Sequence, residues 1–273
     1  LFIDHTEERK TIMKWHRIWA MVVRHLRQLP TDFNKLSSIV YWPFLDIVIY
    51  GFIGIWLDQS IHSPDMRFVL LTNVALWQAV VRADFGVSLN LLEEIWAHNV
   101  TNLFSTPLTI WEWISAAFIE GLIMLAALTA FCVAVVYGFY HYNILELGVW
   151  FVPILLLTYI SGLAIGFLTS SLLVYWGVRV QVLAWMVGWM FAPVSGAYYP
   201  VSVLPAWMQT IAHALPLHYA TVSTHMVLAE HASPLEMLIK GYALGIFYLS
   251  ISIALFIYMF NKSKDRGLQR LRD

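Results

Sequence analysis

Three long stretches of this sequence contain no Asp, Glu, Lys or Arg: residues 147–178, 180–229 and 241–260. A helix needs roughly 20 predominantly apolar residues to cross the hydrocarbon core of a bilayer, so each stretch is long enough. The composition agrees, because 60% of the residues are hydrophobic and only 12% are charged, whereas about 25% are charged in a typical soluble domain. The sequence therefore predicts an integral membrane protein.

The expected fold is all-α, with a six-span transmembrane domain at 37–261, an N-terminal segment at 1–36 and a basic tail at 262–273. Each predicted span is an apolar run long enough for a bilayer. The predicted spans are 39–57, 68–89, 113–137, 147–176, 180–199 and 241–260.

Residues 11–29 predict an amphipathic helix that ends at Pro30. One stripe of this helix is apolar and aromatic, and another is cationic and polar. Such a composition is typical of a helix that lies in the headgroup region of a membrane. The apolar stripe comprises Trp15, Ile18, Trp19, Val22, Leu26 and Leu29, and the polar stripe comprises Lys14, Arg17, Arg24 and Gln28.

The distribution of Lys and Arg predicts the orientation, because these residues are retained on the cytoplasmic side. Six spans place both termini on one side, and of the 16 Lys and Arg residues only Arg67 and Lys240 fall on the other. We therefore expect both termini to be cytoplasmic, in an inner or cytoplasmic membrane. The residues on the basic side are Arg9, Lys10, Lys14, Arg17, Arg24, Arg27, Lys35, Arg82, Arg179, Lys262, Lys264, Arg266, Arg270 and Arg272.

Two connections between spans have an unusual composition. The first, 91–113, has two early acidic residues and then Thr106-Pro107, a pattern that predicts a short helix across the membrane face. The second, from 191 to about 232, is too apolar for a solvated loop and is broken by Pro193, Gly196 and further prolines. Broken backbone at membrane depth must be satisfied by protein or by a water-filled cavity, so short helices that dip into the membrane are expected.

At these connections the sequence resembles the membrane subunits of type-2 ABC exporters, which move polysaccharides, lipids and drugs outward. The resemblance extends over almost the whole chain and depends on the order and topological placement of short motifs. Near the start of the first connection the family usually has a basic residue or glycine, whereas this chain has Ala97 and His98. The motifs are Glu94 through Thr106-Pro107, Pro193-Val194-Ser195-Gly196, Tyr199-Pro200, Leu204-Pro205-Ala206-Trp207 and Leu215-Pro216.

The resemblance implies a transport subunit without catalytic residues of its own. Two permeases, identical or homologous, would assemble with two separate ATPase subunits, and ATP and magnesium would bind in those subunits. A coupling helix at about 91–106 would seat in the ATPase through Glu93, Glu94, His98, Asn99, Asn102, Leu103, Phe104, Thr106 and Pro107. An outer re-entrant segment at about 193–218 would close the exit through Pro193, Ser195, Gly196, Tyr199, Pro200, Leu204, Pro205 and Trp207.

The sequence contains no Gly-x-x-x-x-Gly-Lys phosphate loop, so energy for ATP-driven transport must come from another chain. Two other functions remain open. One is an ion- or proton-coupled secondary transporter, although no internal repeat relates the first three predicted spans to the last three. The other is an intramembrane hydrolase, which is disfavoured because the sequence offers no nucleophile and base at recognisable positions. Nothing in the sequence indicates a nucleic-acid partner.

Polar residues within spans are candidates for the transport path. Asp46 follows Pro43 in the first span, and two interpretations remain open. A charge within the membrane is costly, so Asp46 either serves a function or is paired within the bundle. Alternatively, it caps backbone groups that the proline leaves without hydrogen bonds. Glu120 is a similar case. Arg82 and Asp84 are expected to extend toward the inner surface. The deeper tryptophans, which either line the path or face lipid, are Trp77, Trp185 and Trp189.

Two further patterns have structural interpretations. Gly162 and Gly166 form a small-xxx-small face that predicts close packing of two helices. The outer histidines have spacings that do not place pairs on one helical face, so they are interpreted as interfacial side chains and no metal site is predicted. These histidines are His213, His218, His225 and His231. The single cysteine, Cys132, excludes an intrachain disulfide.

Overall fold

The computed structural model describes residues 13–29, 33–61, 64–268 and 271, and every regular element in these ranges is a helix. The predicted all-α fold is therefore confirmed. Residues 1–12 of the predicted N-terminal segment lie outside the described residues, as do Arg270 and Arg272 of the basic tail.

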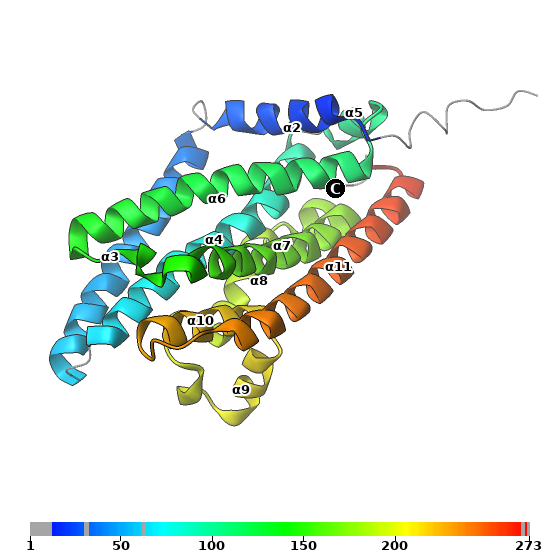
Figure 1. Cartoon of the computed structure of the whole chain (residues 1–273). Helices are drawn as coiled ribbons and strands as arrows, with labels where there is room; N and C mark the ends of the chain where they lie inside the picture. The colour runs from blue at the N-terminus through cyan, green and yellow to red at the C-terminus, as the bar shows by residue number, and fades with distance from the viewer. Residues whose placement is uncertain (1–12, 30–32, 62–63, 269–270, 272–273) are drawn as a thin grey trace, which may run out of the picture.

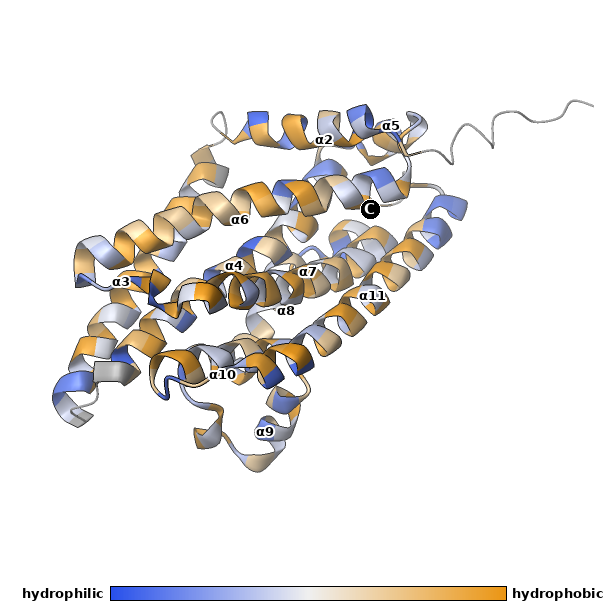
Figure 2. Ribbon diagram, in the orientation of Figure 1, coloured by the Kyte–Doolittle hydropathy of each residue, from blue (hydrophilic) through white to orange (hydrophobic). Residues whose placement is uncertain are grey.

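Five helices of 26 to 33 residues form the body of the molecule (Figure 1). At about 1.5 Å per residue even the shortest is about 39 Å long, more than the roughly 30 Å hydrocarbon core. Hydrophobic residues cover much of their length, and hydrophilic residues gather at the end of the last one (Figure 2). The chain is thus a multi-pass membrane protein by helix length and composition. These helices are α3 (Phe33–Ile61), α4 (Pro64–Trp96), α6 (Ile110–Tyr140), α7 (Phe151–Trp176) and α11 (Leu235–Asp265).

Helix α4 is the centre of this bundle. In its most apolar window 78% of the residues are buried, against 22% in α3 and in α11. Close contact with α7 depends on two glycines: a Cβ on Gly162 would lie 2.4 Å from the carbonyl oxygen of Val80, and one on Gly166 would lie 2.9 Å from that of Asp84. Because these distances leave no room for a side chain, the predicted small-residue face is confirmed.

The predicted span at 180–199 differs from the structure. This region contains the 3-10 helix η2 (Gly177–Val180), the eight-residue helix α8 (Leu183–Met190) and the 3-10 helix η3 (Ala192–Val194). Eight α-helical residues extend only about 12 Å. The sequence is apolar enough for a span, but Pro193 and the left-handed Gly196 (φ 77°) interrupt the backbone hydrogen bonds that a continuous helix requires.

The chain nevertheless returns across the bundle in this region, because α7 and α11 run parallel. Near their starts, the Tyr242 hydroxyl donates to the carbonyl of Pro153 at 2.7 Å. Near their ends, Arg266 Nη1 donates to the Tyr175 hydroxyl oxygen at 2.6 Å. The segment between two parallel helices must lead from the end of the first to the start of the second, so α8 and the 3-10 turns form a broken return path.

Shorter helices lie at opposite edges of the bundle in Figure 1. Helix α2 (Trp15–Gln28) and helix α5 (Val100–Ser105) are at the upper edge, and α9 (Ala206–His213) and α10 (Pro216–Leu228) are at the lower edge. Two further 3-10 turns complete the described elements, η1 (Ile144–Trp150) before α7 and η4 (Val201–Val203) before α9.

Candidate coupling surface and transport path

Helix α5 begins later than the sequence predicted. The predicted helix at about 91–106 is divided, because α4 continues to Trp96 and carries Glu93 and Glu94 in its last turn. The break comes at His98, whose backbone is left-handed (φ 55°). No residue before His98 interrupts the α4 hydrogen bonds, and the Ala97 N–H still donates to the carbonyl of Glu93. The separate helix therefore comprises α5 alone.

Glu94 joins three helices at one buried carboxylate. Its Oε1 accepts from Arg24 Nη2 of α2 at 2.6 Å, and its Oε2 accepts from Asn99 Nδ2 at 2.6 Å. Asn99 directly precedes α5, and Glu94 is only 5% exposed. A buried carboxylate with two close donors holds its partners firmly, so α2, α4 and α5 are coupled mechanically at this point.

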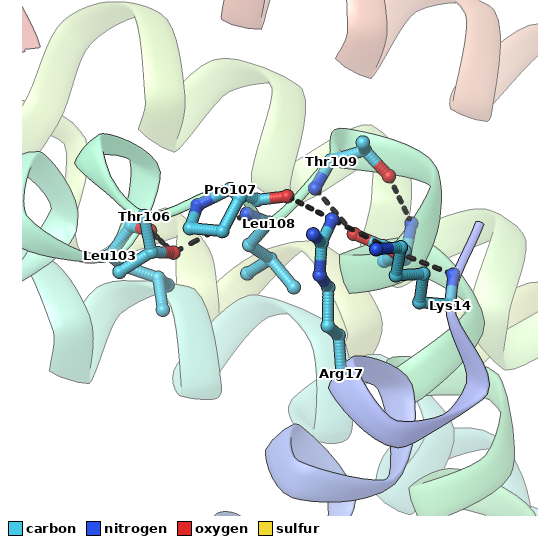
Figure 3. Close-up of polar contacts among 8 residues, drawn as sticks. Lys14, Arg17, Leu103, Thr106, Pro107, Leu108 and Thr109 are labelled. Atoms are coloured by element: carbon cyan, nitrogen blue, oxygen red, sulfur yellow. Dashed lines mark hydrogen bonds and ion pairs between the residues drawn. The ribbon is translucent and has the colours of Figure 1, made fainter. Parts of the chain in front are cut away.

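A second set of contacts joins α2 to the start of α6 (Figure 3). Thr109 and Glu112 form a capping box, in which each side chain accepts from the other residue's backbone N–H, at 3.2 and 2.7 Å. Glu112 also accepts from the Lys14 N–H at 2.8 Å and lies 3.6 Å from Arg17 Nη1. Arg17 donates as well to the carbonyl of Pro107. We call the contacts of α2 with the end of α4, α5 and the start of α6 the α5 junction.

The α5 junction presents a polar face to its surroundings. Leu103 and Phe104 turn inward, where the Phe104 ring lies 4.5 Å from that of Phe260 at the end of α11. Of the predicted coupling residues, Glu94 is buried and Glu93, Asn99, Leu103 and Phe104 are half-buried. Those left exposed are His98, Asn102, Thr106 and Pro107.

At the lower edge, the predicted exit segment is built on a buried hydroxyl turn. Ser195 Oγ donates to the carbonyl of Ala192 at 2.8 Å and accepts from the Ala197 N–H at 3.1 Å. The Thr221 hydroxyl of α10 donates to the Ser195 carbonyl at 3.1 Å. Gly196 fits closely here, since a Cβ on it would lie 2.9 Å from Thr221 Oγ1. These contacts hold the segment after α8 against α10.

The remaining predicted exit residues continue this segment. The Tyr199 hydroxyl donates to the carbonyl of Pro193 at 2.8 Å, which closes the turn between them. Pro200 directly precedes η4, and Pro205 directly precedes α9. Leu204 accepts a hydrogen bond at its carbonyl from Gln209 Nε2, and Trp207 is exposed.

Histidines of α9 and α10 meet at the same edge. The rings of His213 and His218 are 4.8 Å apart, and His218 Nδ1 has no hydrogen-bond partner among the described residues. Burial, and secondarily the neighbouring His213, lower the pKa of His218 to about 4. His218 is therefore neutral at physiological pH.

A cavity of about 450 Å³ lies between α3, α4 and α8. Its lining is mostly aromatic and apolar, with Gln78 and Arg82 of α4 as polar groups. Two of the predicted path tryptophans, Trp185 and Trp189, line it, whereas Trp77 is buried and its ring lies 6.0 Å from that of Trp189. A mostly apolar cavity with a few polar groups is the usual form of a site for an amphiphilic ligand.

Asp46 is paired within the bundle. Gln78 Nε2 of α4 donates to Asp46 Oδ2 at 2.8 Å. This bond joins α3 to α4 beside the cavity, because Gln78 also lines it. Asp46 therefore forms the intrabundle pair that was one of the two interpretations left open by the sequence.

Glu120 lies away from the cavity, beneath α2. His25 Nδ1 is 2.6 Å from its Oε2, and Asn90 Nδ2 donates to both of its oxygens at 3.1 Å. His25 and Glu120 are 7% and 3% exposed. The described contacts thus place Glu120 in a polar network that fastens α2 to α4 and α6.

The prediction for Asp84 is wrong. It was expected to extend toward the inner surface, but it is 1% exposed, and neither of its carboxylate oxygens has a hydrogen-bond partner among the described residues. A Cβ on Gly188 would lie 2.4 Å from Asp84 Oδ2. Glycines of α7 and α8 approach α4 here and enclose a side chain that the sequence alone placed at an interface.

The partners of the acidic residues were not evident from the sequence. The cationic stripe of α2 was assigned to lipid headgroups, but Arg17 and Arg24 face Glu112 and Glu94 of other helices. The available signal was Glu93 and Glu94 at the end of α4 and Glu112 at the start of α6. These charges did not reveal which helices would meet, because opposite charges alone do not determine how two separate helices are aligned.

No model of a known protein family matches this chain, and no curated protein matches it.

Proposed function

We propose that this protein is the membrane subunit of an ABC exporter, which forms the path for an amphiphilic or polymeric substrate and is driven by separate ATPase subunits. The observation that carries the proposal is the α5 junction: a short helix with exposed polar side chains, braced through buried Glu94 against α2 and α4. A braced helix can transmit a push from a docked partner into the bundle. ATP and magnesium would bind in that partner.

The path is proposed at the cavity between α3, α4 and α8. Helix α3 exposes Tyr41, Trp42, Phe52 and Trp56. Exposed apolar residues are ordinary in a membrane protein, but Trp42 also lines the cavity. A second copy of the chain, or a homologous permease, seated there would enclose the path between two cavities.

The α5 junction is proposed to face the cytoplasm. Helix α2 and the end of α11 lie at the same edge, since Phe104 of α5 contacts Phe260, and both carry Lys and Arg residues. Cytoplasmic segments of membrane proteins are enriched in these residues. Helices α9 and α10, with the hydroxyl turn around Ser195, would then close the outer exit.

A secondary transporter is favoured by one observation, the position of Asp46 beside the cavity. In that function Asp46 would carry a proton or ion. Glu120, the other predicted carrier, has no such position. Asp46→Asn separates the two functions: it abolishes gradient-driven transport by a secondary transporter but leaves ATP-driven export largely intact.

The deciding experiment isolates the full chain from its native membrane and measures co-purifying ATP hydrolysis and ATP-driven export in vesicles. Ser105→Lys, at an exposed position of α5, is expected to lower both, because a bulky charge at a helix-in-groove contact prevents docking. Ser233→Lys, equally exposed at the opposite edge, is the matched control and leaves both unchanged. Absence of a bound ATPase in the unmodified protein, or export unaffected by Ser105→Lys, contradicts the proposal.

A further inference from the structure

A second cavity, of about 660 Å³, opens between α2, α6 and α11, away from the proposed path. Its lining includes Met13, Trp15, Trp111, Ser115, Ile119 and Ile253. Among the described residues of the lining, Ser115 is the only one with a polar side chain apart from the indoles. We call this cavity the α2 groove.

The α2 groove is apolar and open, and its tryptophans are of the kind found at a membrane interface. Trp15 is 65% exposed and Trp111 is 53% exposed, and the Trp15 ring stacks on that of Trp19 with centroids 6.5 Å apart. Tryptophans gather where hydrocarbon meets headgroups. In a chain with five helices long enough to cross a membrane, the medium that fills such a groove is lipid.

The walls of the α2 groove are held in place before any ligand arrives. Glu112 binds the Lys14 N–H, and Arg17 binds the Pro107 carbonyl on the side of α2 that faces α6. His25 and Glu120 fix the far end of α2. A preformed groove loses little conformational entropy on binding, so it favours a bound molecule over transient contact.

Charge identifies the headgroup. Lys14 lies between the groove residues Met13 and Trp15, its side chain is exposed, and its ammonium group forms no ion pair within the described residues. Arg17 and Arg24 are both engaged by carboxylates. An available ammonium group beside an apolar groove is complementary to the phosphate of an anionic lipid.

We propose that the α2 groove is a binding site for an anionic phospholipid, with one acyl chain in the groove and the headgroup at Lys14. The occupant is a lipid rather than a second copy of the chain. The groove is an open recess of about 660 Å³ along α2, whereas the exposed apolar residues suited to a second copy are on α3. This proposal requires membrane residence only and is independent of ATP-driven transport.

The test uses the full chain in lipid nanodiscs with a phosphatidylglycerol that carries a photoreactive group in one acyl chain. Labelled peptides located by mass spectrometry are expected to contain Ser115 and Ile119. Ile119→Trp fills the groove and should lower this labelling by about tenfold, since a bulky residue excludes the ligand. Ala130→Trp, at an exposed position three turns farther along the same helix, is the matched control and leaves labelling unchanged.

A second measurement tests the headgroup without altering the packing. Unlabelled phosphatidylglycerol should compete about fivefold better than phosphatidylcholine in the unmodified protein, and Lys14→Gln should remove that preference. Labelling spread evenly over all lipid-facing helices, or equal competition by the two lipids, overturns the proposal. Crosslinking of the groove to a second copy in place of lipid also overturns it.

Discussion

The two edges of the bundle are held together by different chemistry. At the edge that holds α2 and α5, buried or half-buried charges join four helices. Glu94 and Glu112 bind α2 within the α5 junction, and Glu120 binds His25 of α2 deeper in α6. At the α9–α10 edge, hydroxyl groups donate to backbone carbonyls, as Thr221 does to Ser195. Removing one partner of a buried ion pair costs several times more than removing a neutral hydrogen bond.

This difference is compatible with the proposed function, in which the α9–α10 edge rearranges and the α5 junction transmits motion from a docked partner. A segment held by neutral bonds, prolines and a left-handed glycine rearranges at modest cost. A junction held by buried charges moves as one body. The contrast predicts unequal responses to matched substitutions at the two edges.

Glu94→Gln is expected to have the largest effect. It removes the charge that holds Arg24 and weakens the contact to Asn99. The free energy of unfolding should fall by about 2.5 kcal/mol, less than for a fully buried pair, because the Arg24 side chain is 36% exposed. Unfolding in detergent, followed by circular dichroism, measures this. Glu230→Gln is the control at the other edge: it removes the exposed contact with His225 at 3.2 Å and should change stability little. Equal effects of the two substitutions would remove the contrast between the edges.

Gly188→Ala tests whether the broken return helix α8 depends on contact with Asp84. The new Cβ would lie 2.4 Å from Asp84 Oδ2, and overpacking of this kind costs about 2 kcal/mol. Asp84→Ala in the same chain should relieve the clash, so the double variant is expected to be more stable than Gly188→Ala alone. The same unfolding assay measures this cycle. If the changes in the free energy of unfolding were additive, α8 would not depend on its contact with Asp84.

The sequence predicted five of the spans and the presence of short helices at both edges, because apolar length and helix breakers are local properties. Residues 180–199 show the limit: their composition fits a span, but Pro193 and Gly196 decide the conformation. Both residues were recognised as breakers of the following segment, and their effect on the span itself was underestimated.

The side-chain pairs between different helices could not be predicted from the sequence. Asp46 was recognised as a costly charge, yet its partner Gln78 is 32 positions away and lies in another helix. The same holds for Arg24 and Glu94. Such pairs depend on the rotation of each helix about its axis, which is set by close packing at Gly162 and Gly166 and by the sum of many small contacts.

Thr221→Val should have a moderate effect at the α9–α10 edge. The isosteric side chain removes donation to the carbonyls of Ser195 and His218, and a neutral bond of this kind contributes about 1 kcal/mol. Hydrogen exchange should rise in the segment after α8 and stay unchanged at the α5 junction. Thr210→Val, which removes an exposed bond to Ala206, is the control. Increased exchange at both edges would contradict the independence of the two.

The smallest effect is expected from pH. Because the pKa of His218 in the folded protein is lowered to about 4, below the ordinary value of about 6.5, the unfolded chain binds a proton first as pH falls. Stability contributed by neutral His218 is therefore complete above about pH 6.5 and declines between about pH 6.5 and pH 4. His218→Phe, which cannot bind a proton, should flatten that part of the profile of the unfolding midpoint. His16→Phe, at an exposed position of α2, is the control and should leave the profile unchanged. An identical decline in all three proteins would assign the pH sensitivity to other groups.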